Sequence, residues 1–221
     1  MPLVVTIDGP AGAGKSTAAR RLAARLGWRF LDTGAMYRAV TLAALRSGVD
    51  LRSEPELAAL ADRLRVELQP GAVLLDDEDV TEAIRDHEVT RSSRFIADCP
   101  GVRGRLMQWQ RAFADQGDTV TEGRDQGTLV FPDAIRKFFV TASDEERARR
   151  RLAELRDRGQ DVTYEKVLED QRARDARDRS REIAPMKPAA DAEVIDTTDL
   201  TLDQVVEELA RRVLHAIEAQ S

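Results

Sequence analysis

Residues 9–16, Gly9-Pro10-Ala11-Gly12-Ala13-Gly14-Lys15-Ser16, fit the pattern G-x-x-x-x-G-K-[ST]. The run LVVTI at residues 3–7 precedes them, and the helix-period stretch STAARRLAARL at residues 16–26 follows and stops at Gly27. The order of strand, glycine loop and helix is the context in which this pattern binds phosphate at a helix N-terminus. The stretch therefore predicts an α/β fold that holds a nucleoside triphosphate.

This loop supplies the groups that triphosphate binding needs. Its glycines let successive backbone N–H groups turn inward around phosphate oxygens. Lys15 would reach the β- and γ-phosphates, the Ser16 hydroxyl would be a ligand for Mg²⁺, and Thr17 would donate to a neighbouring phosphate. As part of an exposed loop, Lys15 is expected to contribute little packing. The expected ATP-binding residues are Gly9, Pro10, Ala11, Gly12, Ala13, Gly14, Lys15, Ser16 and Thr17.

The composition excludes several classes of protein. The chain has 221 residues, which suits one globular unit with a modest insertion. The longest apolar run, Leu57 to Ala61, is far shorter than the roughly 20 residues of a membrane-spanning helix, and the N-terminus lacks the pattern of a secretory signal. We therefore expect a cytoplasmic protein without membrane contact. The net charge of −6 argues against a protein whose whole surface binds nucleic acid and leaves local basic patches open, and we expect no nucleic-acid partner.

Strands and helices continue to alternate along the chain, which predicts a parallel sheet. The other expected strands are residues 28–31, 118–122, 137–141 and 192–198. A helix is expected from the DTGAMYR stretch to near Gly48. Another is expected after Thr201, which forms a capping box with Gln204.

The alternation is interrupted between residues 48 and 98. Ser53 with Glu56 predicts a capping box that opens a short helix. The stretches RVELQ and AVLLDDEDV flank Pro70-Gly71, which predicts a hairpin. We interpret this part as an inserted subdomain.

A charge-rich stretch occupies residues 144–182, where basic and acidic side chains nearly balance. Ser143 with Glu146 predicts a capped helix, and the helical pattern breaks at Gly159 and restarts near Thr163. These features predict two helices with solvated surfaces.

Two polar motifs each follow an expected strand, at the sheet edge where α/β proteins bind ligands. They are DTGAMYR at residues 32–38 and EGRDQGT at residues 122–128. The first places Arg38 toward a cleft, and its plainer interpretation is a helix N-cap at Asp32 or Thr33. The plainer interpretation of the second is a polar loop.

A third motif lies in the charge-rich stretch, where RARDARDRSR spans residues 172–181. Spacings of four and three place Arg174, Asp178 and Arg181 on one helical stripe, with Arg177 beside it. An alternating arginine and aspartate helix is more often a solvated salt-bridge face, so this interpretation stays open beside a ligand-binding one.

The phosphate loop by itself does not separate a kinase from a switch GTPase or a motor ATPase. The chain lacks an N-K-x-D segment that would read a guanine base, and its 221 residues leave no room for force-transmitting modules. A small-molecule kinase is therefore the leading class. A nucleotide-dependent switch or binding module is the alternative.

Four segments, in this order and spacing, resemble the bacterial cytidylate kinases over almost the whole chain: TIDGPAGAGKST, LDTGAMYRAV, EGRDQGTLVFPDA and RDARDRSREIAP. The resemblance implies a three-layer P-loop NTPase sandwich with a five-stranded parallel sheet, as a single domain over residues 1–221. It implies an inserted nucleoside-monophosphate-binding subdomain at residues 48–98 and a helical lid at residues 147–182. The implied reaction moves the γ-phosphoryl group of ATP to CMP or dCMP with Mg²⁺, in a monomer. A kinase for another monophosphate or a small alcohol is the second enzyme interpretation.

The resemblance also assigns roles by position. The residues that match nucleoside-binding positions are Thr33, Arg103, Asp125, Arg174 and Asp178. The arginines that match positions near the acceptor phosphate are Arg38, Arg124 and Arg181. The residues expected to act in catalysis are Lys15, Arg181 and the lid arginines Arg150 and Arg151. At two positions the chain departs from the family: Arg94 stands where a base-contacting serine is common, and Glu122 where some members have aspartate.

Overall fold

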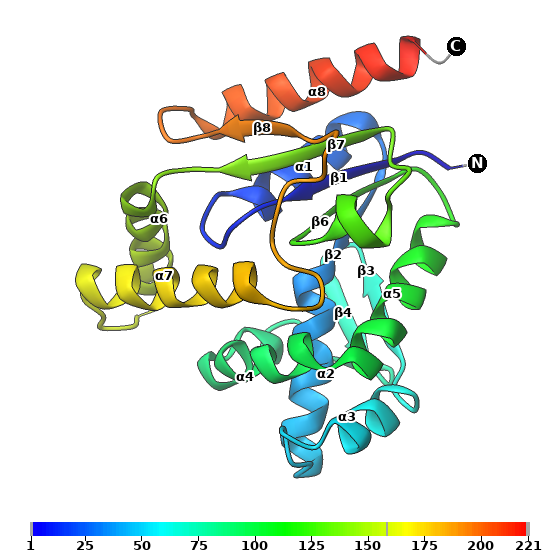
Figure 1. Cartoon of the computed structure of the whole chain (residues 1–221), viewed down its shortest axis with the longest axis vertical. Helices are drawn as coiled ribbons and strands as arrows, with labels where there is room; N and C mark the ends of the chain where they lie inside the picture. The colour runs from blue at the N-terminus through cyan, green and yellow to red at the C-terminus, as the bar shows by residue number, and fades with distance from the viewer. Residues whose placement is uncertain (1, 158, 220–221) are drawn as a thin grey trace. The chain divides into compact units, whose positions relative to one another are not determined.

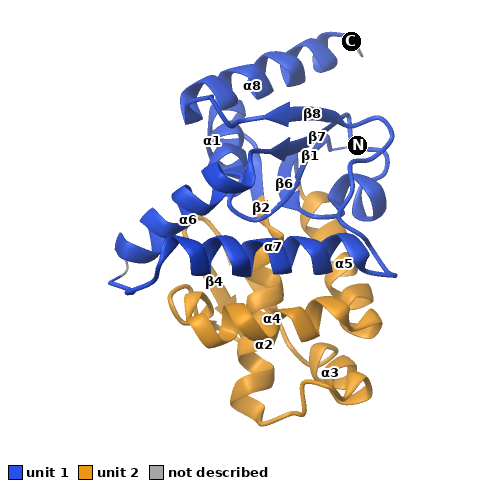
Figure 2. Ribbon diagram, turned by 60° about the vertical axis from the view of Figure 1, so that its left-hand side comes forward, with its two compact units in different colours: residues 1–30, 117–221 blue, residues 31–116 orange. Residues whose placement is uncertain are grey.

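A computed structural model describes residues 2–157 and 159–219 of the chain (Figure 1). Residue 158, which belongs to the expected lid at residues 147–182, lies outside this description. The chain divides into two compact units (Figure 2). The first comprises residues 1–30 and 117–221, and the second comprises residues 31–116.

The first unit is built around a sheet with the strand order β2-β6-β1-β7-β8. The strands are β1 (Val4–Asp8), β2 (Arg29–Asp32), β6 (Thr119–Gly123), β7 (Arg136–Thr141) and β8 (Glu193–Asp196). β1 runs parallel to β6 and β7, and β7 runs parallel to β8. The division between the two units falls inside the edge strand β2. The expected α/β fold with a five-stranded parallel sheet is confirmed.

The described helices of this unit alternate with its strands along the chain. They are α1 (Lys15–Leu26), the short π-helical turn η2 (Gln126–Val130), α6 (Asp144–Asp157), α7 (Tyr164–Ser180) and α8 (Leu202–Glu218). The capping box of Thr201 with Gln204 opens α8 as expected. The N–H of Glu146 donates to the Ser143 hydroxyl at 3.2 Å, which confirms the cap of α6.

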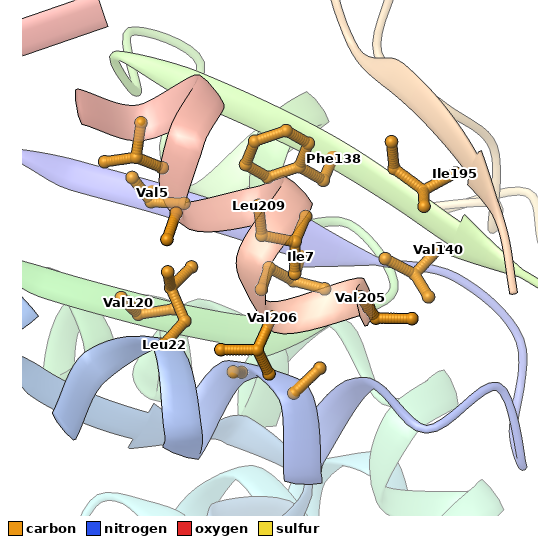
Figure 3. Packing of buried hydrophobic residues seen from close by; sticks show 14 of the residues in the cluster. Val5, Ile7, Leu22, Val120, Phe138, Val140, Ile195, Val205, Val206 and Leu209 are labelled. Carbon is orange, nitrogen blue, oxygen red and sulfur yellow. The ribbon is translucent and has the colours of Figure 1, made fainter. Parts of the chain in front are cut away.

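One continuous core packs α1 and α8 against the sheet (Figure 3). Alternate strand residues such as Ile7, Phe138 and Val140 are fully or almost fully buried, because period-2 alternation turns them to one face. From the helices, Leu22 and Leu209 pack onto them and are also fully buried. This core fixes the carboxyl ends of β1, β6 and β7, where the loops with the candidate site begin.

The second unit is mainly helical with a small antiparallel sheet. Its elements are α2 (Thr33–Ser47), α3 (Glu54–Ala61), β3 (Val66–Gln69), β4 (Ala72–Leu75), β5 (Glu78–Asp79), the 3₁₀ turn η1 (Ala83–Arg85), α4 (His87–Asp98) and α5 (Pro100–Ala114). α2 packs on α4, and α3 packs on α5 (Figure 2). The expected subdomain at residues 48–98 lies within this unit, and its boundaries and role stay predictions.

The expected hairpin is confirmed, because β3 and β4 pair antiparallel around the turn at Gly71. The expectation for AVLLDDEDV is wrong in one respect. β4 ends at Leu75, and Asp76 and Asp77 adopt positive φ angles of 49° and 70°, so the chain turns again and β5 pairs back onto β4. Aspartate tolerates this left-handed conformation better than most residues, which explains why a run of acids forms a turn.

A second expectation is corrected at the start of α3. Ser53 is the N-cap residue, as predicted, but its side chain makes no capping hydrogen bond, so the capping box with Glu56 does not form. The helix has proline in its first turn instead, where a missing N–H costs no helical hydrogen bond.

Candidate functional site

The phosphate loop joins β1 to α1 at the carboxyl edge of the first unit's sheet. At Gly9 the backbone has φ of 140°, and a Cβ there would lie 2.0 Å from the Val140 carbonyl oxygen. Only glycine fits so close to β7. Gly14 is the N-cap residue of α1 and provides no side-chain cap, so the first N–H groups of the helix are left to an anion.

Lys15 is buried, with 4% of the residue exposed, which corrects the expectation of an exposed loop residue. Its Nζ donates to the Pro10 carbonyl oxygen at 2.7 Å, so the side chain folds back under the loop that it closes. Burial, with repulsion from Arg124 and Arg174 and against the attraction of Glu122, lowers the pKa of Lys15 to about 7. The charged form of Lys15 is therefore unfavourable in the free protein, and an anion bound in the loop would stabilise it.

Ser16 lies against Glu122, and its hydroxyl donates to Glu122 Oε1 at 2.9 Å. Glu122 is buried and lies in β6, the strand beside β1. A hydroxyl and a carboxylate are hard oxygen donors, which suit Mg²⁺ together with phosphate oxygens and water. Within residues 2–157 and 159–219, no cluster of three acidic, histidine or cysteine side chains offers a metal site of protein ligands alone. The sequence had left Glu122 without a role, although its place at the end of a strand was a usable signal.

The EGRDQGT motif is not the simple polar loop of the plainer interpretation. Asp8 accepts hydrogen bonds from the N–H groups of Gln126 at 2.9 Å and Gly127 at 2.8 Å, and these bonds fix the π-helical turn η2. Burial raises the pKa of Asp8 to about 7, although these two hydrogen bonds favour its ionised form. Asp125 is also buried and repels Asp8. The motif is thus held at the phosphate loop by the last residue of β1.

Arg124, Asp178 and Arg181 form a linked set within the first unit. The Asp178 carboxylate, with 6% of its side chain exposed, lies 3.2 Å from Arg124 Nε and 2.8 Å from Arg181 Nη2. For these residues the solvated-face interpretation is wrong, because the packing of α7 covers the carboxylate. Arg174 lies near enough to Lys15 to lower the pKa of the lysine. The structure therefore brings the predicted residues of the two motifs together around the phosphate loop.

The two expected lid arginines have different surroundings. Arg150 donates to Glu146, to the Thr197 hydroxyl at 3.1 Å and to the Thr197 carbonyl at 2.7 Å. Its Nη1 lies 3.8 Å from where a Cβ on Gly14 would stand, which places it at the phosphate loop. Arg151 instead pairs with Glu154 at 2.9 Å on a partly exposed surface.

Three predicted residues lie in the second unit. Thr33 is buried at the start of α2, after Asp32, whose side chain accepts from the Ala35 N–H at 2.8 Å. The N-cap interpretation is confirmed for Asp32. Arg38 Nη2 lies 3.8 Å from Asp32 Oδ1. Arg103, from α5, lies over the Tyr37 ring at 6.0 Å and donates to a carbonyl of α4.

At the position of the family's base-contacting serine, Arg94 of α4 lies over the Phe95 ring, 4.7 Å from its centre. The preceding Ser92 is buried, and the Ser93 hydroxyl donates to the Thr90 carbonyl at 2.8 Å. The contact of this region with a base stays a prediction.

Arg147 is a residue at the phosphate loop that the sequence did not predict. It is the first arginine of the EERARRR run and is 1% exposed. Its Nη1 donates to the Ala11 carbonyl oxygen of the phosphate loop at 2.8 Å. The run showed only a charged helix, because the burial of one arginine among four depends on how α6 packs against the loop.

The fold and the loop define a P-loop protein of the nucleotide-kinase type, with candidate phosphate-binding groups, a hydroxyl–carboxylate pair and arginines at one sheet edge. The described residues contain no helix with the length and apolar character that crossing a membrane requires. A shikimate kinase from Bacteroides thetaiotaomicron has the same fold, with a TM-score of 0.51 at 15% identity over 96% of this chain and 99% of that one.

Sequence comparison defines the family. The family model for cytidylate kinase matches residues 5–215. A cytidylate kinase of Pseudomonas putida (strain W619) is 48% identical over 96% of this chain and 97% of the relative. Another, of Rhodopirellula baltica, is 46% identical over 99% of this chain and 96% of the relative. The chain belongs to the cytidylate kinase family.

Proposed function

We propose that this protein transfers the γ-phosphoryl group of ATP to CMP or dCMP, which yields ADP and CDP or dCDP. The observation that carries the proposal is the phosphate loop with Lys15 beneath it and the Ser16–Glu122 pair beside it, in a chain of the cytidylate kinase family. The reaction belongs to pyrimidine nucleotide metabolism.

The chemistry needs charge and alignment more than it needs a base. The acceptor is a phosphate oxygen, which is already largely ionised at neutral pH, so no strong proton acceptor is required. Two anions must meet in line while charge spreads over the transferred group. Lys15, Arg150, Arg151 and Arg181 supply the countercharge in this proposal.

A magnesium ion completes the donor side. Ser16 would be its ligand from the loop, and Glu122 would hold it directly or through water, because the two oxygens already lie 2.9 Å apart. When bound, the ion would neutralise part of the negative charge of the phosphates.

On the acceptor side, the proposal keeps the roles that the family resemblance implies. The nucleoside would be held by Thr33, Arg103, Asp125, Arg174 and Asp178, and its phosphate by Arg38, Arg124 and Arg181. The ion pairs of Asp178 with Arg124 and Arg181 support these roles, because they hold both arginines in fixed positions. Residues 48–98 would form the acceptor subdomain and residues 147–182 the lid, which excludes water as a competing acceptor.

The proposal extends to the setting of the enzyme. It acts as a monomer in the cytoplasm, where ATP and CMP are available, and its partners are these small molecules rather than nucleic acid or membrane. The net charge of −6 supports the exclusion of nucleic acid.

An ADP-release assay with Mg-ATP and one acceptor at a time tests the proposal. The acceptors are CMP, dCMP, UMP, AMP, GMP and dTMP. Strong release with CMP and dCMP, and weaker release with UMP, is the expected result. Preference for another monophosphate would show that Arg94 changes base choice, and nucleotide binding without acceptor-dependent release would favour a nucleotide-dependent switch.

A further inference from the structure

A buried arginine connects α6 to the phosphate loop. Each part of the Arg147 guanidinium is used: Nε donates to the Ala142 carbonyl at 3.1 Å, Nη1 to the Ala11 carbonyl at 2.8 Å, and Nη2 to the Asp144 carboxylate. With 1% exposure, the charge lies out of solvent. Removing a guanidinium from water costs free energy, so a buried arginine needs a nearby negative charge to compensate it.

Asp144 of α6 is partly exposed, and the buried balancing charge comes from α7. Arg147 Nη1 lies 2.6 Å from Asp175 Oδ2, and Asp175 is 2% exposed. Neither Asp175 oxygen forms a hydrogen bond among the described residues, so Arg147 is the cation that compensates this carboxylate. In an ion pair without solvent, removal of one partner leaves the other charge uncompensated.

The loop itself rests on the same two helices. A Cβ on Gly12 would lie 3.1 Å from the Arg147 carbonyl oxygen and 3.1 Å from Gln171 Oε1 of α7. Gln171 in turn donates to the Asp144 carbonyl at 3.3 Å. The turn at Ala11 and Gly12 is therefore packed directly against the first turn of α6 and the middle of α7.

The bond to Ala11 has a geometric consequence for phosphate binding. The Ala11 carbonyl and the Gly12 N–H belong to one planar trans peptide, so they point in opposite directions. When Arg147 holds the carbonyl outward, the Gly12 N–H is turned toward the inside of the loop, where phosphate oxygens bind.

We propose that Arg147 and Asp175 are a positioning pair that fixes the Ala11–Gly12 peptide for the phosphates of the bound nucleotide. Neither residue needs to touch substrate: Arg147 acts through the loop backbone, and Asp175 acts by keeping Arg147 in place. The proposal rests on the proposed ATP-dependent function, and it adds that the first turn of α6 and the middle of α7 tune donor binding.

The variants separate positioning from simple structural support. Arg147→Lys keeps a charge for Asp175 but has one nitrogen in place of the fork, so it cannot bond Ala142, Asp144 and the Ala11 carbonyl at once as Arg147 does. The double variant Arg147→Met with Asp175→Asn removes both charges, so it leaves no uncompensated buried ion and is expected to fold. Arg172→Ala is the matched control, since Arg172 joins the same helices through Asp144 and Glu145 but is 54% exposed.

Binding of ADP, measured by calorimetry, is the first readout, and urea unfolding is the second. We expect Arg147→Lys and the double variant to weaken ADP binding about tenfold or more, because a charge-assisted hydrogen bond that orders the loop is lost. In turnover, KM for ATP should rise while KM for CMP stays within about twofold. Arg172→Ala should change none of these values by more than about twofold.

Normal ADP affinity in the folded double variant would overturn the proposal, because it would show that the pair only supports the fold. Failure of the proposed function is a separate result. It would appear in the unaltered protein as ADP binding without CMP-dependent turnover, whereas failure of the positioning role would appear only in the variants.

Discussion

Two sets of ion pairs in the first unit use the same residue types in different surroundings. The outer pairs join α1 to α8 and comprise Arg21 with Asp203 and Arg25 with Glu207. The inner pairs comprise Asp178 with Arg124 and Arg181, and Arg147 with Asp175. In the outer set the Asp203 side chain is 87% exposed, whereas in the inner set that of Asp178 is 6% exposed.

This difference in burial separates surface chemistry from site chemistry. Exposed ion pairs contribute little, because water and salt screen them and ordering two long side chains costs entropy. Buried pairs carry a desolvation cost that apolar residues would avoid, so their presence needs another explanation. At the phosphate loop, the explanation that we propose is a set of cations held in place for an anionic ligand.

The largest effect is expected from Lys15→Ala, which removes the buried cation beneath the loop. Turnover should fall about 10³-fold, because the charge that develops on the transferred phosphoryl group loses its nearest fixed cation. Thermal stability should not fall, since a buried ammonium that the pKa of about 7 shows to be unfavourably placed is removed. The ADP-release assay and a melting curve measure the two quantities.

The exposed Lys166 provides the control for this variant. It pairs with Asp170 on α7 and is 59% exposed, so Lys166→Ala should keep normal turnover. Equal activity in the two lysine variants would contradict the role of Lys15.

The second effect concerns the stripe on α7. Arg181→Ala should lower kcat about 10²-fold, with the fold preserved because Asp178 keeps Arg124 as a partner. Arg179→Ala, two residues away and exposed, is the matched control and should be kinetically silent. If both variants turned over CMP at the same rate, the inner pairs would be no more functional than the outer ones.

Local patterns in the sequence predicted most of the fold. The phosphate loop, the core face of α8 with its cap at Thr201, and the hairpin at Gly71 depend on residues close together in the chain. The cap at Ser53 was the exception, because a suitable pair of residues does not guarantee that the side chain turns onto the backbone.

Burial in the site could not be predicted, because it depends on contacts between distant segments. Asp8 fixes the turn after Asp125 through backbone groups 118 and 119 residues away, so the sequence alone left a polar loop open beside a ligand-binding motif. The stripe spacing was right for Asp178, but the spacing is the same in an exposed helix and a covered one. For the same reason Lys15 was expected to be exposed, and Arg147 went unnoticed.

The third prediction uses pH to distinguish the buried cation from the exposed ones. With a pKa lowered to about 7, Lys15 is mostly neutral in the free protein above that pH. Bound phosphates favour the ammonium, so ADP binding takes up a proton and affinity should fall as pH rises, by up to about tenfold per unit between about pH 7.5 and 9. Calorimetry in two buffers of different ionisation enthalpy measures the uptake directly.

Lys15→Met is the control for this pH effect, and its ADP affinity should be low and flat over the same range. A flat profile in the unaltered protein would mean that Lys15 stays charged without ligand. The buried Lys15 would then have the same protonation state as an exposed lysine.

The smallest effect is expected at an outer pair. In Arg25→Gln the partner Glu207 keeps full access to water, so no buried charge is left uncompensated. The ion pair raises the pKa of Arg25 and lowers that of Glu207 through their hydrogen bond, yet both groups are charged at neutral pH with or without it. The melting temperature should therefore shift by less than about 3 °C, and less still in high salt, with kcat unchanged. A loss of turnover in Arg25→Gln would remove the distinction between the two sets, because it would show that burial does not mark which ion pairs serve the reaction.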